Sequence, residues 1–296
     1  MTERRDGVIV FVMRASGRAA HLRAGTWREV TPEAAGWRYL SFRLLALGPG
    51  ERAMVGGGAD ELGIVLLAGS VRVGGPGETW RMTRTSVFEE PPWAVYLPAG
   101  AAATVEAEAP AELAVVGARA DRRGEARLIA PADVEVEVRG AGSATRQINH
   151  VIPPAFPAHR LLVVEVLTPA GNWSSYPPHK HDRDRPPAEV ALEEFYYFRV
   201  RPPHGFAFQR VYSPEREVDL TVAVGDGDVV LVPYGYHVSA APHGFDLYYL
   251  NGLAGDTRSM AASDDPSLAY IRATWSGMPK DPRVPMAAGP RGGTDA

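Results

Sequence analysis

The chain has 296 residues, a formal net charge of −4 and no cysteine. This length is sufficient for two domains, each with its own apolar core. Basic and acidic side chains are interspersed along the chain, so the charge pattern indicates neither a nucleic acid nor an anionic membrane as a partner. Without cysteine there are no disulfides and no thiolate ligands, and any bound metal must be held by nitrogen and oxygen donors.

The N-terminal part of the chain carries no targeting or membrane signal that we recognise. The apolar segment 8–13 is too short for a signal-peptide core, and Arg14 follows it directly. No stretch approaches the roughly 20 apolar residues that a membrane-spanning helix needs. We therefore expect a cytoplasmic protein without a membrane partner.

Short apolar runs separated by Gly and Pro predict β-strands along most of the chain. A convincing amphipathic pattern of a dozen residues, typical of a long helix, is not found. The expected fold is mostly β, with one β-barrel or jelly roll in each half. The runs are 37–47, 62–68, 94–97 and 113–116 in the first half, and 161–167, 195–200, 229–232 and 247–250 in the second.

The two halves are weakly similar to each other, which predicts two related domains. The segment 61–66 resembles 193–198, and 95–102 resembles 230–237, so that Ala102 stands where the second half has His237. We place the first domain at 1–145, the second at 146–275, and a Pro- and Gly-rich tail without structure of its own at 276–296.

The second half contains the residues of a possible metal site. His179 and His181 are two positions apart, so on an extended strand their side chains share a face. Glutamates at 193 and 194 begin a later aromatic run, and Pro233, Tyr234 and Gly235 form a turn before His237. Three histidines and one glutamate could bind a divalent metal; the alternative is a set of structural histidines. The first half, with Gly58, Ala101 and Ala102 at its motif positions, is expected to bind no metal and to serve structure and assembly.

The order of these residues resembles the two cupin motifs, in which one hairpin supplies two histidines and a glutamate and another supplies a histidine. Only one of the adjacent glutamates can face the metal without a bulge. Since cupin glutamates usually precede the aromatic run by one position, we favour Glu193, and Glu194 stays the alternative. Lys180 should point away from the histidines, as a surface lysine.

The run Gly171 to Asp182, which reads Gly-Asn-Trp-Ser-Ser-Tyr-Pro-Pro-His-Lys-His-Asp, resembles the 5-deoxy-glucuronate isomerase family. The likeness extends to 193–198, 205–212, 225–237 and 249–251, and covers most of the first half. It implies a bicupin fold and the aldose–ketose isomerisation of 5-deoxy-glucuronate to 5-dehydro-2-deoxy-gluconate in myo-inositol catabolism. A more distant relative, the 5-keto-4-deoxyuronate isomerase family of pectin breakdown, binds zinc through the same order of ligands.

The resemblance implies one divalent metal, for which zinc is our first choice and iron or manganese stay open. Two other functions compatible with a cupin remain: a mononuclear iron dioxygenase and a non-catalytic sugar-binding protein. A homo-oligomer is expected, because two linked barrels leave sheet faces and edges to cover.

A uronate substrate needs a cation for its carboxylate, and an arginine fork can bond both oxygens. Arg210 is our first candidate, with Arg146 and Arg160 as competitors, and Gln209 and Tyr236 complete the predicted substrate-binding set. No catalytic base can be assigned. The conceivable ones are Tyr236, Tyr248 and Glu165.

Overall fold

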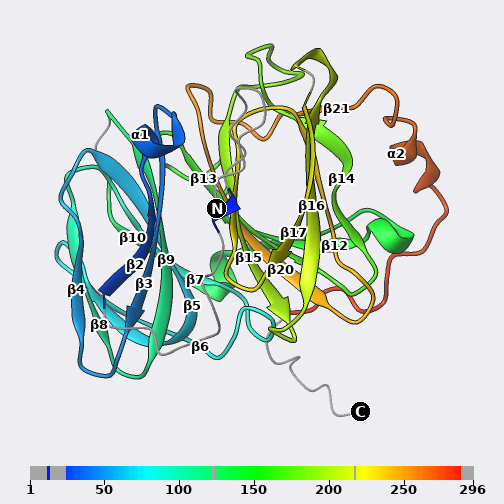
Figure 1. Ribbon diagram of the computed structural model, residues 1–296. Helices are drawn as coiled ribbons and strands as arrows, with labels where there is room; N and C mark the ends of the chain where they lie inside the picture. The colour runs from blue at the N-terminus through cyan, green and yellow to red at the C-terminus, as the bar shows by residue number, and fades with distance from the viewer. Residues whose placement is uncertain (1–11, 14–24, 122–123, 217, 288–296) are drawn as a thin grey trace.

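The computed structural model describes residues 12–13, 25–121, 124–216 and 218–287, which form two β-barrels side by side (Figure 1). The mostly-β prediction is confirmed. The described α-helices are single turns, α1 (Pro32–Ala35) and α2 (Ile271–Thr274), and three short 3-10 segments lie at Pro131–Asp133, Gly142–Ala144 and Pro214–Arg216. No helix in the described part of the chain is long and apolar enough to span a membrane.

The first barrel is built around one long strand, β5, which pairs with β7 and β9 along one part of its length and with β6 and β8 along the other. The order β10-β7-β5-β9-β3-β2 forms its larger sheet, and β4 pairs with β8. Its strands are β2 (Gly25–Val30), β3 (Leu40–Leu47), β4 (Arg52–Gly56), β5 (Asp60–Gly74), β6 (Thr79–Arg84), β7 (Trp93–Leu97), β8 (Ala102–Ala107), β9 (Ala111–Arg119) and β10 (Arg127–Ile129).

The second barrel consists of a seven-stranded and a five-stranded sheet. The seven-stranded sheet has the order β1 (Val12–Met13), β18 (Val229–Val232), β15 (Glu193–Arg201), β20 (Asp246–Ala254), β13 (Leu161–Thr168), β12 (Arg146–Ile152) and β11 (Glu135–Arg139). The five-stranded sheet has the order β17 (Val218–Gly225), β16 (Phe206–Ser213), β19 (Tyr236–Ala240), β14 (Trp173–Lys180) and β21 (Ser263–Asp264).

Separate apolar clusters fill the two barrels and the space between them. Strand β15 contributes to two of these clusters, because successive side chains on a strand point to opposite faces. Phe195 and Tyr197 pack in the cluster shared with the first barrel, where Phe195 lies 4.5 Å from Phe42 between ring centroids. Tyr196 and Phe198 pack inside the second barrel. Both faces of β15 are therefore buried.

Buried carboxylates connect the two barrels through hydrogen bonds and an ion pair. Glu61 on β5 accepts hydrogen bonds from the backbone N–H groups of residues 159, 160 and 161, at the start of β13. Glu165 on β13 forms a bidentate ion pair with Arg84 on β6, with nitrogen–oxygen distances of 2.7 and 2.9 Å and both side chains fully buried. The relative position of the barrels is thus fixed by paired polar groups as well as by apolar packing.

Two of the expected boundaries differ from the structure. Strand β11 already belongs to the seven-stranded sheet, where it pairs with β12, so the second barrel begins before residue 146. Residues 276–287, expected to lack structure, pack against the second barrel: Val284 and Ala287 are buried, and the Gln147 amide oxygen accepts a hydrogen bond from Met286 N at 2.6 Å. A few well-placed small and apolar residues suffice for this docking, which composition did not reveal. Residues 288–296 lie outside the described part.

Candidate metal centre

Three side chains from both sheets of the second barrel converge in its interior. His181 follows the end of β14, Glu194 lies on β15, and His237 lies on β19. Their ligand-type atoms all lie within 4.8 Å of one another, and all three side chains are buried. His179 stands beside this triad, with its ring centroid 4.7 Å from that of His237. The expected convergence of the histidines is therefore present.

Each imidazole is oriented through its Nδ1 atom by a backbone carbonyl. Nδ1 lies 2.9 Å from Leu192 O in His181, 3.1 Å from Gly235 O in His237 and 3.3 Å from Pro177 O in His179. Donation from Nδ1–H to these carbonyls directs each Nε2 into the cluster, where a neutral ring would offer its lone pair to a ligand, and Nε2 of His181 lies within hydrogen-bond distance of Glu194. This is the arrangement by which proteins hold histidines that ligate metals.

The turn before His237 depends on glycine. Gly235 has a φ of +95°, and a Cβ atom there would lie 2.7 Å from Tyr212 O. A larger residue would be strained and would displace the carbonyl that orients His237.

Glu194 offers one carboxylate oxygen to two imidazoles. Its Oε2 lies 3.0 Å from His181 Nε2 and 3.1 Å from His237 Nε2. The contact to His237 does not have hydrogen-bond geometry, and His237 Nε2 is a buried atom without a hydrogen-bond partner. A buried acceptor left open beside a carboxylate and a second imidazole fits a divalent cation, which would take lone pairs from all three groups.

The pKa shifts in the cluster differ from residue to residue. Burial would raise the pKa of Glu194, but the imidazoles of His237 and His181 outweigh it and hold that pKa well below its usual range. Burial, together with His237 and His181, lowers the pKa of His179 well below the ordinary value. For His181 burial acts in the same direction, yet the hydrogen bond and charge of Glu194 raise its pKa. The cluster therefore carries an ionised carboxylate and a neutral His179.

The glutamate favoured from the sequence is not the one beside the histidines. Glu193 points to the opposite face of β15, where its carboxylate accepts hydrogen bonds from the backbone N–H groups of Arg38, Tyr39 and Leu40 at 2.6, 3.0 and 2.8 Å. Glu194, the alternative, takes the inward position. Since both faces of β15 are buried, the apolar pattern alone could not indicate which face is the barrel interior.

The internal repeat did contain the missing signal. Glu61 aligns with Glu193, and both residues hold backbone N–H groups at the start of a strand in the other barrel. Leu62 aligns with Glu194, just as Ala102 aligns with His237. The first half thus has apolar residues at the positions of Glu194 and His237, and these are two of the residues that meet at the candidate centre.

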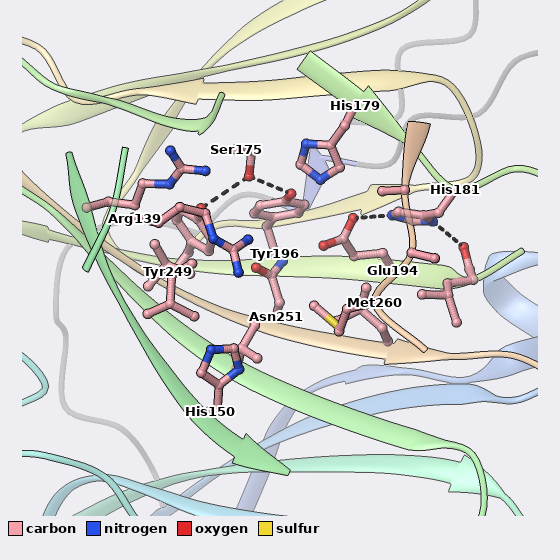
Figure 2. A pocket seen from close by; sticks show the side chains of 18 residues that line it. Arg139, His150, Ser175, His179, His181, Glu194, Tyr196, Tyr249, Asn251 and Met260 are labelled. Atoms are coloured by element: carbon pink, nitrogen blue, oxygen red, sulfur yellow. Dashed lines mark hydrogen bonds and ion pairs between the residues drawn. The ribbon is translucent and has the colours of Figure 1, made fainter. Parts of the chain in front are cut away.

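A cavity lined by polar side chains opens beside the triad (Figure 2). Ser175 has a φ of +51° inside β14, where the pairing with β19 shifts register. Its hydroxyl lies 3.0 Å from the Tyr196 hydroxyl and 3.2 Å from the Tyr249 hydroxyl. The lining residues include His179, His181, Glu194, Ser175, Tyr196, Tyr249, Asn251, Met260, Arg139, Arg146, Ile148 and His150.

Two residues of the predicted substrate-binding set lie elsewhere. Arg210 lies partly exposed on the outer face of β16, paired with Asp219 at 2.8 and 2.6 Å. Tyr236 precedes His237 on β19 and so points outward, with its ring 5.4 Å from Tyr212. Gln209 does face the barrel interior: it is fully buried, its Oε1 accepts a hydrogen bond from Ser239, and its Nε2 has no hydrogen-bond partner.

The other residues singled out from the sequence have structural contacts. Tyr248 donates a hydrogen bond to Glu165 at 2.8 Å between the barrels, so neither residue lines the cavity beside the triad. Arg160 packs over the Tyr39 ring and pairs with Asp121, also outside that cavity.

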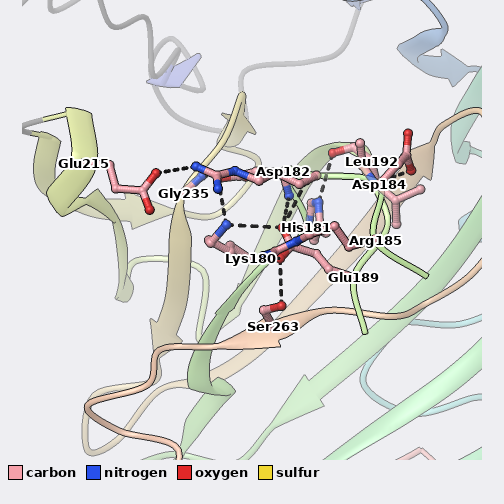
Figure 3. A network of polar contacts seen from close by, with 12 residues as sticks. Lys180, His181, Asp182, Asp184, Arg185, Glu189, Leu192, Glu215, Gly235 and Ser263 are labelled. Atoms are coloured by element: carbon pink, nitrogen blue, oxygen red, sulfur yellow. Dashed lines mark hydrogen bonds and ion pairs between the residues drawn. The ribbon is translucent and has the colours of Figure 1, made fainter. Parts of the chain in front are cut away.

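Lys180 points away from the histidines, as expected, but it is buried and not a surface residue. Figure 3 shows it in a polar network around Glu189. The Glu189 carboxylate accepts hydrogen bonds from Lys180 at 3.3 Å, from the backbone N–H of Asp182 and Arg183 at 2.8 and 3.0 Å, and from Ser263 at 2.7 Å. This network fixes the loop between His181 and Glu194.

Comparison with known proteins identifies relatives over most of the chain. A model of the KduI/IolB family matches residues 12–271. A protein of Geobacillus kaustophilus (strain HTA426) named 5-deoxy-glucuronate isomerase is 47% identical over 246 residues, which are 82% of this chain and 89% of the relative. A protein of the same name from Bacillus subtilis (strain 168) is 40% identical over 247 residues, 82% of this chain and 91% of the relative.

Solved structures share the fold. An IolB-like protein from Salmonella typhimurium LT2 superposes with a TM-score of 0.84 at 39% identity, covering 88% of this chain and 98% of that protein. The oxalate decarboxylase of Bacillus subtilis, a protein with Mn(II) centres, has a TM-score of 0.61 at 15% identity over 88% of this chain and 80% of its own. The second likeness concerns the fold alone, and the two together confirm the predicted bicupin architecture.

Proposed function

The chain belongs to the KduI/IolB family, and we propose that it is a 5-deoxy-glucuronate isomerase whose second barrel holds one divalent metal ion. The names of the aligned relatives support the reaction and the substrate. The observation that carries the metal site is the buried triad of two imidazoles and a carboxylate, in which His237 Nε2 lacks a hydrogen-bond partner.

The proposed ligands are His181, Glu194 and His237, with His179 as the fourth. Because Nδ1 of each of the three histidines contacts a backbone carbonyl, the Nε2 atom is the one that would bind the metal through its lone pair. Nitrogen and carboxylate ligands suit zinc, which we place first, and equally iron or manganese. For the first barrel we propose a structural role, because Leu62 and Ala102 stand there at the positions of Glu194 and His237.

The reaction moves a proton from C2 to C1 of the substrate and the hydroxyl proton from O2 to O1, which shifts the carbonyl from C1 to C2, so it consumes no oxidant. A metal ion in this site would polarise the C1 carbonyl and stabilise the negative charge that develops on oxygen by several kcal/mol. The chain itself supplies a cavity beside the triad and a row of hydroxyl groups from Ser175, Tyr196 and Tyr249. Gln209, with its unpartnered Nε2 inside the barrel, is a further candidate for a substrate contact.

A homo-oligomer is part of this proposal. Trp173, Phe206 and Phe208 are between 41% and 44% exposed on strands of the five-stranded sheet. Exposed aromatic side chains on a sheet face are typical of an interface. Sedimentation velocity should give a species larger than one chain, and a strictly monomeric protein would remove this part of the proposal.

Incubation with 5-deoxy-glucuronate in deuterated water, followed by NMR, tests the activity. We expect the metal-loaded protein to form 5-dehydro-2-deoxy-gluconate without oxygen, and the metal-free protein to form it at least about 100-fold more slowly. Solvent deuterium at the hydroxymethyl carbon of the product, which was C1 of the substrate and is C6 in the numbering of the gluconate, would identify proton transfer through an enediol. A requirement for oxygen would indicate a dioxygenase instead, and no conversion with zinc, iron or manganese would refute the proposed reaction.

A further inference from the structure

The cavity beside the triad extends along the inner face of the seven-stranded sheet to strand β12. Arg146, Ile148 and His150 alternate on β12 and all line this cavity. Gln147 and Asn149, between them, point the other way: Asn149 donates a hydrogen bond to Glu165 between the barrels. The alternation of the strand therefore places a guanidinium in the same cavity as the candidate metal centre.

Arg146 is buried without a carboxylate partner among the described residues. The residue is 4% exposed, and its Nη1 donates a hydrogen bond to Ala144 O at 3.1 Å. The Trp275 ring lies 5.9 Å from its guanidinium carbon. No ion pair joins Arg146 to another described residue, although buried arginines are almost always paired.

The other arginine of the cavity differs in this respect. Arg139, labelled in Figure 2, donates from Nε and Nη2 to both carboxylate oxygens of Glu137 at 2.6 and 2.7 Å. His150 also contacts Glu137, at 3.0 Å. The Glu137 carboxylate is thus shared by Arg139 and His150, and among the described residues Arg146 has no carboxylate within ion-pair distance. Burial, together with Arg139 and Arg272, lowers the pKa of Arg146 to about 10.

Hydroxyl groups connect Arg146 with the triad. Tyr249 lines the same cavity as Arg146, and its ring lies 4.9 Å from that of Tyr196. The Ser175 hydroxyl bonds both tyrosines, and the Tyr196 ring lies 5.9 Å from that of His237. A sugar acid with its carbonyl at the triad and its carboxylate at Arg146 would lie along this row of donors.

We propose that Arg146 binds the carboxylate of the substrate, at the end of the cavity opposite the candidate metal centre. This inference rests on the proposed function, because it takes the ligand to be a uronate. A bound carboxylate gives Arg146 the partner that the chain does not supply, and the planar fork of the guanidinium can bond both oxygens. Arg146 thereby orients the substrate so that its aldehyde end reaches the triad.

Two matched ligands test this role separately from turnover: D-glucuronate, and D-glucuronamide, in which a neutral amide replaces the carboxylate. We expect the metal-loaded wild-type protein to bind the acid at least about 10-fold more tightly in calorimetry, as one charge-assisted contact predicts. Arg146→Met should abolish this preference and raise KM for 5-deoxy-glucuronate by about 10- to 100-fold, with metal content unchanged. Arg146→Lys, which keeps the charge, should show a smaller loss and serves if the Met variant does not fold.

Arg210→Met is the control, because Arg210 lies partly exposed on the outer face of the barrel; it should bind and turn over like the wild type. If Arg146→Met and Arg146→Lys both keep the wild-type preference for glucuronate, or the wild type itself has none, the assignment of Arg146 is wrong. A wild-type protein that prefers glucuronate but does not convert 5-deoxy-glucuronate would refute the proposed reaction and leave the carboxylate site supported.

Discussion

Replacement of Glu194 by Gln should remove the bound metal, whereas replacement of Glu193 should not. The Glu194 carboxylate faces two buried imidazoles, and a neutral amide would supply a weaker donor and no compensating charge. Loss of residues that only support metal ligands lowers affinity about 10- to 100-fold, so loss of a ligand should cost more than about 100-fold. We expect the Kd for the metal to rise at least this far, and metal content after dialysis and kcat to fall with it.

Glu193→Gln is the matched control, one residue away on the same strand. It should keep the metal and most of the activity but lose stability, because an amide cannot accept all three backbone hydrogen bonds from residues 38–40. A loss of about 1–3 kcal/mol in the free energy of unfolding is expected. Full metal content in Glu194→Gln, with loss in Glu193→Gln, would reverse the assignment. Elemental analysis of both folded variants measures the difference.

Arg84→Met should destabilise the protein by about 3–5 kcal/mol in the free energy of unfolding, because it leaves the Glu165 carboxylate buried without a counter-ion. Arg84 and Glu165 are both fully buried. The guanidinium also donates to the carbonyls of Leu66 and Glu90 in the first barrel at 3.0 and 2.9 Å, so Arg84 links this barrel with β13 of the second through Glu165. Denaturant unfolding followed by circular dichroism measures the loss.

The double variant Arg84→Met/Glu165→Gln distinguishes the loss of stability caused by an unpaired buried charge from the loss caused by missing packing. The Tyr248 hydroxyl now donates to Glu165 at 2.8 Å, and the amide introduced by Glu165→Gln would still accept this hydrogen bond but would carry no charge. We expect the double variant to be more stable than Arg84→Met by at least about 1 kcal/mol. If the single variant loses less than about 1 kcal/mol, the pair does not stabilise the interface between the barrels.

The sequence predicted the fold and three histidines of the site because these depend on local signals. Apolar runs between turn residues indicate strands wherever they occur, and His179 and His181 share a face by strand alternation alone. The choice between Glu193 and Glu194 depends on which face of β15 lies inside the second barrel. The apolar pattern carries no such information, since Phe195 packs between the barrels as completely as Tyr196 packs inside one.

Substrate-binding residues were harder to predict, because an arginine on a strand has the same appearance whether it faces the barrel or the solvent. Arg210 alternates with the buried Gln209 and is therefore outward, and Asp219 on the neighbouring strand β17 neutralises it. Arg146 faces inward because of the way β12 pairs within the seven-stranded sheet. The residues of this pairing are distant in the sequence from the metal motif. The tail near Met286 was missed for the same reason: its partner, Gln147, is far away in the sequence.

The measurement that tests the central claim most directly is the isomerase rate as a function of bound metal. Metal-free protein would be titrated with zinc, iron(II) or manganese(II), with bound metal counted by elemental analysis and the rate followed with 5-deoxy-glucuronate. We expect the rate to rise in proportion to bound metal and to become constant at one equivalent per chain. Full activity without metal, or a rate that becomes constant only at two equivalents, would contradict a single metal centre in the second barrel.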